Sequence, residues 1–273
     1  SMPGTSVVAV HNPTGTQYCT TSRGDGRFNI PNLSVGGPYT VTVSFVGYET
    51  QKAEGIYLTL GENRNLQFSV KQSATELGEV VVSGSNVDRT GAAIAFDNNT
   101  IRSMPTITRS AADIYRLTPS SDGNSFGGRN DQYNNFSLNG TIFNNPFGLD
   151  AATPGGQTDA QPVSLDAIDQ IQVSIAPYDV TQSGFTGASI NAVTKSGTNT
   201  FSGTAFGFYR NQGLTGSKVD GKDIIVPDLR QFQAGFSLGG PIIKDKAFFF
   251  VNFEIERRED QGTTFLAAKA GRS

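Results

Sequence analysis

The sequence predicts a mainly β protein in which two β-rich ends flank a mixed α+β middle. Apolar and polar residues alternate with a period of two near both ends, for example over 39–44 and 249–256, and this is the period of half-buried strands. The 32 glycines and the hydrophobic content of 36% favour strands and tight turns over a bundle of helices. A length of 273 residues leaves room for two domains, or for a small domain and part of a larger one.

Residues 1–72 predict an N-terminal antiparallel β-sandwich. Val8 and Val10 share one face of a first strand, Tyr39 to Phe45 alternate with threonine and serine, and Leu66, Phe68 and Val70 form a third apolar face. Turn signals separate these runs at Asn12-Pro13, Gly24-Asp25-Gly26, Gly36-Gly37-Pro38 and Gly61-Glu62-Asn63. Several short strands at this spacing indicate a small sandwich.

The sequence of this region resembles that of the carboxypeptidase regulatory-like domain, which has a prealbumin-like, carbohydrate-binding-like fold. The matching segments are PGTSVVAV (3–10), the turn GDGRF (24–28) and GGPYTVTVSFVGYE (36–49). That family has one more strand before the point where this chain begins. We therefore expect the first strand to be missing, an unpaired sheet edge to remain, and the chain to be an excerpt of a longer protein.

Residues 73–90 form a linker around a short β-branched strand, with Gly78 on one side and Gly84 on the other. Two interpretations stay open: one more strand of the sandwich, or a docking strand for another protein. The segment resembles the TonB box of Bacteroidetes receptors. That resemblance implies contact with a TonB-type inner-membrane energy transducer through Glu79, Val80, Val81, Val82 and Ser83.

Residues 91–198 predict an α+β domain of short helices, short strands and long loops. Ser110 and Asp113 form a capping-box-like helix start, Ile114 and Leu117 are expected to share a face, and Pro119 marks the end. Asn139-Gly140 between apolar residues is a hairpin signal.

The end of this domain, Ser164 to Gly197, has the most informative pattern. Ser164 can cap a short helix, and the strand that follows places Ile171 and Val173 on one face. Pro177 ends that strand, since proline has no N–H for a ladder. A glycine-rich turn then leads to a second strand with Ile190, Ala192 and Thr194.

This unit resembles the end of the plug domain of TonB-dependent outer-membrane receptors. The matching residues are Ile168, Ile171, Val173, Pro177, Tyr178, Gly184, Gly187, Ile190, Asn191, Thr194, Ser196 and Gly197. The later stretch GGPIIKDKAFFFVNFE (239–254) resembles the Oar-like branch of that family.

Residues 199–273 predict the first three strands of an outer-membrane β-barrel. Three long alternating runs, 201–210, 231–238 and 249–256, fit the apolar-out, polar-in pattern of such barrels. We expect 211–230 to form a long external loop and 244–246 a short turn. Three strands cannot close a barrel, so the barrel is incomplete in this chain.

We expect no catalytic residue, no metal site and no cofactor, and hence no enzyme. Gly123 to Gly127 match the hydrolase pattern G-x-S-x-G, but the strand-to-helix frame is missing and the sole histidine, His11, lies upstream. His11 is expected at a strand end and Cys19 half-buried in a strand. The polar run 122–135 is expected to be a loop rather than a calcium site. The net charge of −3 gives no case for binding nucleic acid.

The resemblance implies a receptor that imports a nutrient, an oligosaccharide or a peptide, through a barrel gated by the plug. It implies the outer membrane of a Gram-negative bacterium, with the N-terminal domain and the TonB box in the periplasm. The implied partners are the energy transducer, an unknown extracellular ligand and outer-membrane lipid. One plug loop is the candidate ligand-facing segment: Arg129, Asn130, Asp131, Tyr133, Asn134 and Asn135.

Alternatives to each of these assignments remain open. Arg129 and Asp131 can instead only fix the plug inside the barrel. The whole protein can be an Oar-like surface protein for adhesion or signalling on the same fold. Residues 1–72 taken alone fit a soluble carbohydrate-binding sandwich.

Overall fold

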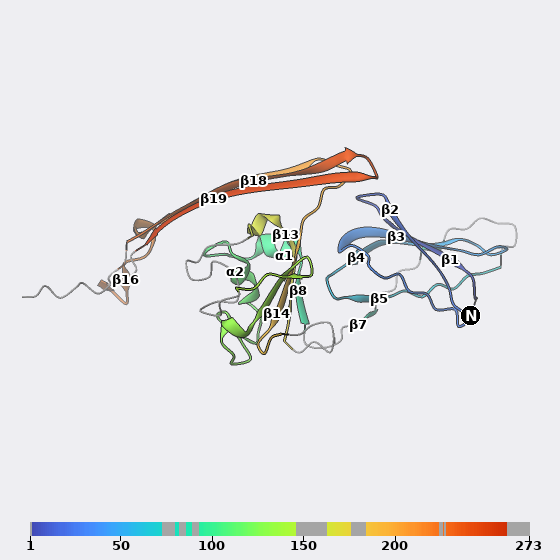
Figure 1. Ribbon diagram of the computed structural model, residues 1–273, viewed down its shortest axis with the longest axis horizontal. Coiled ribbons are helices and arrows are strands. Elements are labelled where there is room, and N and C mark those ends of the chain that lie inside the picture. The colour runs from blue at the N-terminus through green and yellow to red at the C-terminus, as the bar shows by residue number, and fades with distance from the viewer. Residues whose placement is uncertain are drawn as a thin grey trace, which may run out of the picture. The chain divides into compact units, whose positions relative to one another are not determined.

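A computed structural model describes residues 2–72, 80–81, 86–88, 93–145, 163–175, 184–223, 226 and 228–260 of the chain (Figure 1). The described residues are mainly β, as the sequence predicts. The chain divides into two compact units, Ser1–Phe201 with Gly239–Phe250, and Ser202–Leu238 with Val251–Ser273. Over the described ranges, every helix is too short or too polar to cross a membrane.

The N-terminal sheet has five strands in the order β2-β1-β3-β4-β6. They are β1 (Ser6–His11), β2 (Thr16–Thr21), β3 (Gly36–Ser44), β4 (Gln51–Leu58) and β6 (Val80–Val81). β1 pairs antiparallel with both β2 and β3. Its buried face carries Val7 and Ala9, so Val8 and Val10 share the opposite, half-exposed face. Strands β3 and β4 add Tyr39, Val41, Val43, Ala53 and Ile56 to the same core.

A second layer covers this core, but extended chain replaces the hydrogen-bonded sheet that the sequence predicts. Phe28, Leu66, Phe68 and Val70 pack against the sheet, and residues 64–70 alternate between half-buried and exposed. The one strand there is β5 (Asn63–Asn65), which pairs with β7 (Asn86–Asp88). The alternating pattern of residues 64–70 therefore correctly indicated burial on one side. Such a pattern does not show whether the segment pairs with a neighbouring strand.

The structure confirms the predicted position of His11 and contradicts the predicted burial of Cys19. His11 ends β1, as expected. Cys19 is exposed, so the expectation of a half-buried cysteine is wrong. It lies on β2, the edge strand of the sheet, where four of the six residues are exposed.

The middle of the chain forms a second five-stranded sheet in the order β12-β11-β14-β13-β8. Its strands are β8 (Ala93–Phe96), β11 (Asn135–Leu138), β12 (Thr141–Ile142), β13 (Ile168–Ser174) and β14 (Ser189–Thr194). β11 and β14 are parallel, and the other neighbours are antiparallel. As predicted, Asn139 and Gly140 turn the β11–β12 hairpin, both with positive φ.

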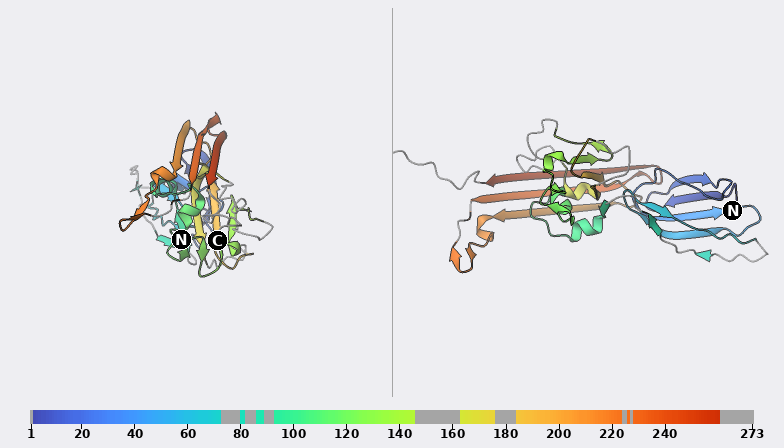
Figure 2. Two further views of the ribbon diagram at one scale, coloured as in Figure 1. Left: turned by 90° about the vertical axis from the view of Figure 1, so that its left-hand side faces the viewer. Right: turned by 90° about the horizontal axis from the view of Figure 1, so that it is seen from below.

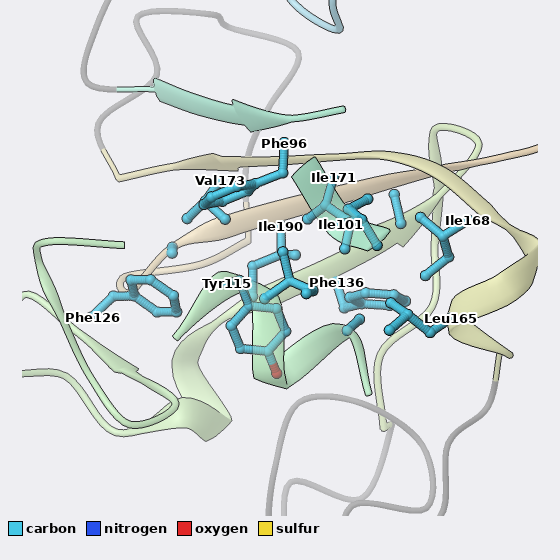
Figure 3. Close-up of a cluster of buried hydrophobic side chains, with 14 residues drawn as sticks. Phe96, Ile101, Tyr115, Phe126, Phe136, Leu165, Ile168, Ile171, Val173 and Ile190 are labelled. Atoms are coloured by element: carbon cyan, nitrogen blue, oxygen red, sulfur yellow. The ribbon is translucent and has the colours of Figure 1, made fainter. Parts of the chain in front are cut away.

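Short helices and buried side chains complete this domain. The helices are α1 (Asn98–Ser103), α2 (Ala111–Tyr115), and the 3₁₀ helices η1 (Asp131–Tyr133) and η3 (Leu165–Ala167). One cluster of apolar side chains from α1, α2, η3 and the strands fills the space between them (Figure 3). Its fully buried members include Ile114, Phe126, Phe136, Ile168, Ile171, Val173 and Ile190.

The predicted helix starts are confirmed, and one predicted helical face is wrong. Ser110 and Asp113 form a reciprocal capping box at α2, and Ser164 caps η3. Ile114 is fully buried, whereas Leu117 is 46% exposed. α2 ends at Tyr115, so Leu117 falls beyond the turn that would have carried it to the same face.

The two strands of the most informative stretch lie where the sequence predicts them. Ile171 and Val173 on β13 and Ile190 on β14 face the core. Gln170 and Ser174 are buried as well, so the polar side of β13 does not face solvent. Pro177 and Tyr178 lie outside the described residues.

The last part of the chain forms a three-stranded sheet in the order β15-β18-β19. These strands are β15 (Ser202–Asn211), β18 (Leu229–Ile243) and β19 (Ala247–Asp260), and Figure 2 shows them side by side. Asp245 has a positive φ in the predicted turn between β18 and β19. The expected long loop contains η4 (Gln212–Leu214) and a small hairpin of β16 (Lys218–Val219) and β17 (Lys222–Asp223). The described strands form an open sheet and no closed barrel.

Candidate functional site

The candidate coupling segment, Glu79–Ser83, is partly described. Val80 and Val81 form β6, which adds to the outer edge of β4 in a parallel pair. The register partners are Gln51 with Val80 and Lys52 with Val81. Glu79, Val82 and Ser83 lie outside the described residues. In position, β6 is thus one more strand on the N-terminal sheet; whether it also binds a partner protein stays a prediction.

The candidate ligand loop divides into an exposed and a buried part. Arg129, Asn130 and Tyr133 are exposed and Asp131 is half-buried. The side chain of Asn130 caps η1 by accepting a hydrogen bond from the Gln132 backbone N–H at 3.0 Å. Polar groups and an aromatic ring therefore meet solvent together at η1.

Asn134 and Asn135, by contrast, are buried and bonded within the protein. The side-chain nitrogen of Asn134 donates to the Asn124 carbonyl at 2.9 Å, and its oxygen accepts from the Ala188 N–H at 2.9 Å. The Asn135 side-chain oxygen accepts from Asn144 at 2.8 Å. A Cβ on Gly187 would overlap the Asn134 side-chain oxygen, so a larger residue at 187 would displace the Asn134 side chain from its hydrogen bonds. These two asparagines hold the loop in place.

The hydrolase-like pattern around Ser125 has no catalytic frame. β9 (Ser121–Asp122) and β10 (Ser125–Phe126) pair as a two-residue ladder that turns at Gly123. Ser125 therefore lies in a hairpin instead of a strand-to-helix elbow. In the part of the chain that the structure describes, no three His, Cys, Asp or Glu side chains come together as metal ligands.

A half-buried charge cluster lies where β14 ends, and the sequence did not predict it. The Lys195 ammonium donates to the Asp166 backbone carbonyl at 2.6 Å and lies 3.7 Å from the Asp166 carboxylate. Burial lowers the pKa of Lys195 and raises the pKa of Asp169, an effect that the Lys195 charge partly offsets. The only sequence signal was the presence of charges at the ends of two predicted strands.

The same exit segment passes close to the last strands. A Cβ on Gly197 would lie 2.3 Å from the Phe249 carbonyl oxygen and 2.7 Å from that of Gly240. Both obstacles are backbone atoms, which cannot rotate away. Gly197 is therefore required for the chain to leave β14 beside β18 and β19.

The sheet of β15, β18 and β19 has two chemically different faces. On one face Gln231 donates to Glu256 at 2.7 Å, Gln233 donates to Glu254, and the Thr204 and Ser237 hydroxyls lie 2.6 Å apart. On the other face, large apolar side chains are about half exposed: Phe232, Phe236, Leu238, Val251, Phe253 and Ile255. Over β18 and β19 this is the apolar-out, polar-in arrangement of a membrane β-barrel wall, while Phe206 of β15 lies on the polar face, beside Gly235.

Comparison with known proteins gives matches at both ends of the chain. Residues 1–71 match the family described as Carboxypeptidase regulatory-like domain, and residues 193–270 match the Outer membrane beta barrel domain. The chain is 29% identical over 266 residues to the TonB-dependent transporter Oar of Myxococcus xanthus, a match that covers 89% of this chain and 24% of that protein. The chain thus spans about a quarter of this relative's length.

One solved structure is also similar, the siderophore receptor PirA from Acinetobacter baumannii. It is 21% identical, with a TM-score of 0.47, over 61% of this chain and 24% of the receptor. The two matches to Oar and to the barrel family support an outer-membrane location. The chain is therefore similar to the TonB-dependent transporter Oar, with a match to a carboxypeptidase regulatory-like domain at its start and a match to an outer membrane beta barrel domain at its end.

Proposed function

We propose that this chain is part of a TonB-dependent transporter that imports a nutrient, an oligosaccharide or a peptide, across the outer membrane. The observation that carries the proposal is the continuity between two different structures. The mixed domain ends at β14, and three residues later, at Gly197, the chain runs against the backbone of a sheet with one apolar face and one polar face. A plug joined directly to a membrane wall is what a gated barrel requires.

The proposed domains follow from this continuity. Residues 1–72 are the N-terminal domain, 73–90 a linker with the coupling strand, 91–198 the plug and 199–273 the first three barrel strands. A barrel of about 22 strands has a lumen wide enough to leak unless it is filled. The plug fills it and must move or partly unfold for each transport event, which requires work from an energy transducer. An origin in the Bacteroidetes stays a prediction from the coupling segment.

We assign transducer binding to the coupling strand and ligand binding to the candidate ligand loop. Glu79–Ser83 pairs with a strand of the TonB-type transducer in the periplasm, since strand addition gains main-chain hydrogen bonds with few demands on side chains. The extracellular ligand meets Arg129, Asn130, Asp131 and Tyr133, while Asn134 and Asn135 support the loop from below. No enzymatic step is proposed, and the named relatives are a transporter and a receptor.

Uptake measured in cells tests this proposal. Cells with and without the gene, and cells lacking the transducer, receive a fluorescent library of peptides and oligosaccharides. We expect accumulation of one ligand class that is lost in both deletion strains. If uptake is unchanged while cell–cell adhesion is lost, the protein is an Oar-like surface adhesin and the transport proposal is wrong.

A further inference from the structure

The N-terminal domain has two strand pairings whose partner strands come from the linker that follows it. β6 (Val80–Val81) lies parallel on β4, and β7 (Asn86–Asp88) lies antiparallel on β5, with Arg64 opposite Val87. The two pairings are separate ladders on two strands of one domain. Because both hold the same short linker, they fix it along the domain at two points.

β4 provides the sheet edge on which the linker strand β6 pairs. At Gln51 and Lys52, β4 already pairs on its inner side with β3, opposite Val43 and Thr42. Its outer edge would carry unpaired N–H and C=O groups at these positions without β6, and such an edge is a template for an added strand. Gln51 is 2% exposed and its side chain donates to the Ser69 carbonyl, which fixes β4 at the docking position.

The docked linker contains the middle of the proposed coupling strand. We propose that the edges of β4 and β5 form a strand-binding site of the carboxypeptidase regulatory-like domain, that its ligand is this chain's own linker, and that the domain and the energy transducer compete for it. This rests on the proposed function of Glu79–Ser83. Over the linker residues that the structure describes, the two ladders involve two and three residues, so each of these described ladders is short.

The domain and the transducer compete because the transducer must pull the coupling strand away from the receptor. A transducer must draw the coupling strand away from the receptor, and a linker fixed at two points cannot be drawn away until both ladders open. The transducer can bind only those chains in which the strand is free. Its apparent affinity is therefore its intrinsic affinity multiplied by the fraction of such chains. By reciprocity, transducer binding weakens docking to the same extent.

Engineered disulfides test the docking itself. In a Cys19→Ser background, which removes the one native thiol, Lys52→Cys is combined with Val81→Cys. Register partners on neighbouring strands lie within disulfide reach. The matched control, Tyr57→Cys with Val81→Cys, places the first thiol five residues further along β4, about 16 Å away. Asn63→Cys with Asp88→Cys tests the β5–β7 ladder in the same way.

We expect mild oxidation of the folded chain to cross-link both register pairs and to leave the off-register pair reduced. Equal cross-linking of all three pairs, or none in the register pairs, contradicts the docking site. Binding is then measured with the purified periplasmic domain of the TonB-type transducer. We expect the oxidised Lys52→Cys, Val81→Cys chain to bind at least about tenfold more weakly than its reduced form.

The two proposals fail in different ways in this experiment. Equal or tighter binding by the oxidised form overturns the competition and leaves the coupling role intact. If neither the reduced variant nor the wild type binds the transducer domain, the coupling role of Glu79–Ser83 is wrong, and the competition falls with it.

Discussion

The side-chain oxygen of Asn134 accepts a hydrogen bond from the backbone N–H of Ala188, 2.9 Å away. This contact joins the end of the candidate ligand loop to the residue before β14. Ala188 itself is fully buried, so no water can replace the lost partner easily. The loop is therefore held by the residue that leads into β14.

Removal of this side chain should destabilise the plug. We expect Asn134→Ala to lower the free energy of unfolding by about 1–3 kcal/mol, because a buried N–H and the Asn124 carbonyl both lose their partner. Thermal unfolding of the chain in detergent measures this. The neighbour Tyr133 is 49% exposed, and Tyr133→Ala should change stability by less than about 0.5 kcal/mol. Similar losses in both variants would contradict the division of the loop into supporting and exposed residues.

The exposed part of the loop should instead affect ligand binding. Tyr133→Ala and Arg129→Ala remove an aromatic ring and a guanidinium group that face solvent. We expect each to weaken binding of the imported ligand about tenfold or more, as for polar and aromatic contacts in other sites, with the folded barrel unchanged. Equilibrium binding of labelled ligand to whole cells gives the result. Unaltered affinity in both variants would assign these residues to fixing the plug.

His11 should make the N-terminal domain less stable in acid. Its ring is buried against Tyr39, with ring centroids 4.8 Å apart, and one nitrogen lies 2.8 Å from the Thr14 hydroxyl. Burial lowers the pKa of His11 below the ordinary value of 6.5, so between the two values the unfolded state binds more protons than the folded state. Stability is then complete above the unfolded pKa and falls as the pH drops through this window.

The sole histidine makes this prediction direct to measure. Thermal unfolding from about pH 8 to pH 5, around the ordinary histidine pKa, should show a slope in the wild type that His11→Gln removes, and the one imidazole resonance should titrate below its ordinary range. Parallel pH profiles for the two proteins would show that His11 does not titrate differently on folding.

A charge on the apolar face of β19 should block assembly in the membrane. Phe253 is 55% exposed on that face, whereas its neighbour Asn252 lies on the opposite face, half-buried. We expect Phe253→Lys to destabilise the inserted full-length receptor by about 2–4 kcal/mol and Asn252→Lys to be tolerated. Heat-modifiable migration of the receptor from outer membranes reports folding. A tolerated lysine at 253 would mean that this face does not meet lipid.

Much of the architecture could be predicted because it depends on local signals. The period-two alternation placed β15, β18 and β19, the Asn139-Gly140 pair placed a hairpin, and the Ser110 capping box placed α2. Each of these signals acts through a residue's own backbone preference or through burial on one side.

What the sequence did not reveal depends on contacts between distant segments. The Lys195–Asp166 pair joins residues 29 positions apart, and the support of the ligand loop by Asn134 depends on Ala188, 54 positions away. Docking of β6 on β4 needs an open edge, and hydrophobic pattern does not show which strand has one. Leu117 and Cys19 were misjudged because a helix ended early and a strand lay at a sheet edge.

The central claim is that Glu79–Ser83 couples this receptor to an energy transducer, and a single proline tests it most directly. Val81→Pro removes one ladder N–H and fixes φ, so strand addition should fail at the middle of the segment. Ala74→Pro, in the same linker but outside both Glu79–Ser83 and β7, is the matched control. Energised uptake and ligand binding to cells are measured side by side for both variants in the full-length receptor. We predict that Val81→Pro abolishes uptake and leaves binding intact, while Ala74→Pro keeps both; import by the Val81→Pro receptor at the wild-type rate would contradict the account.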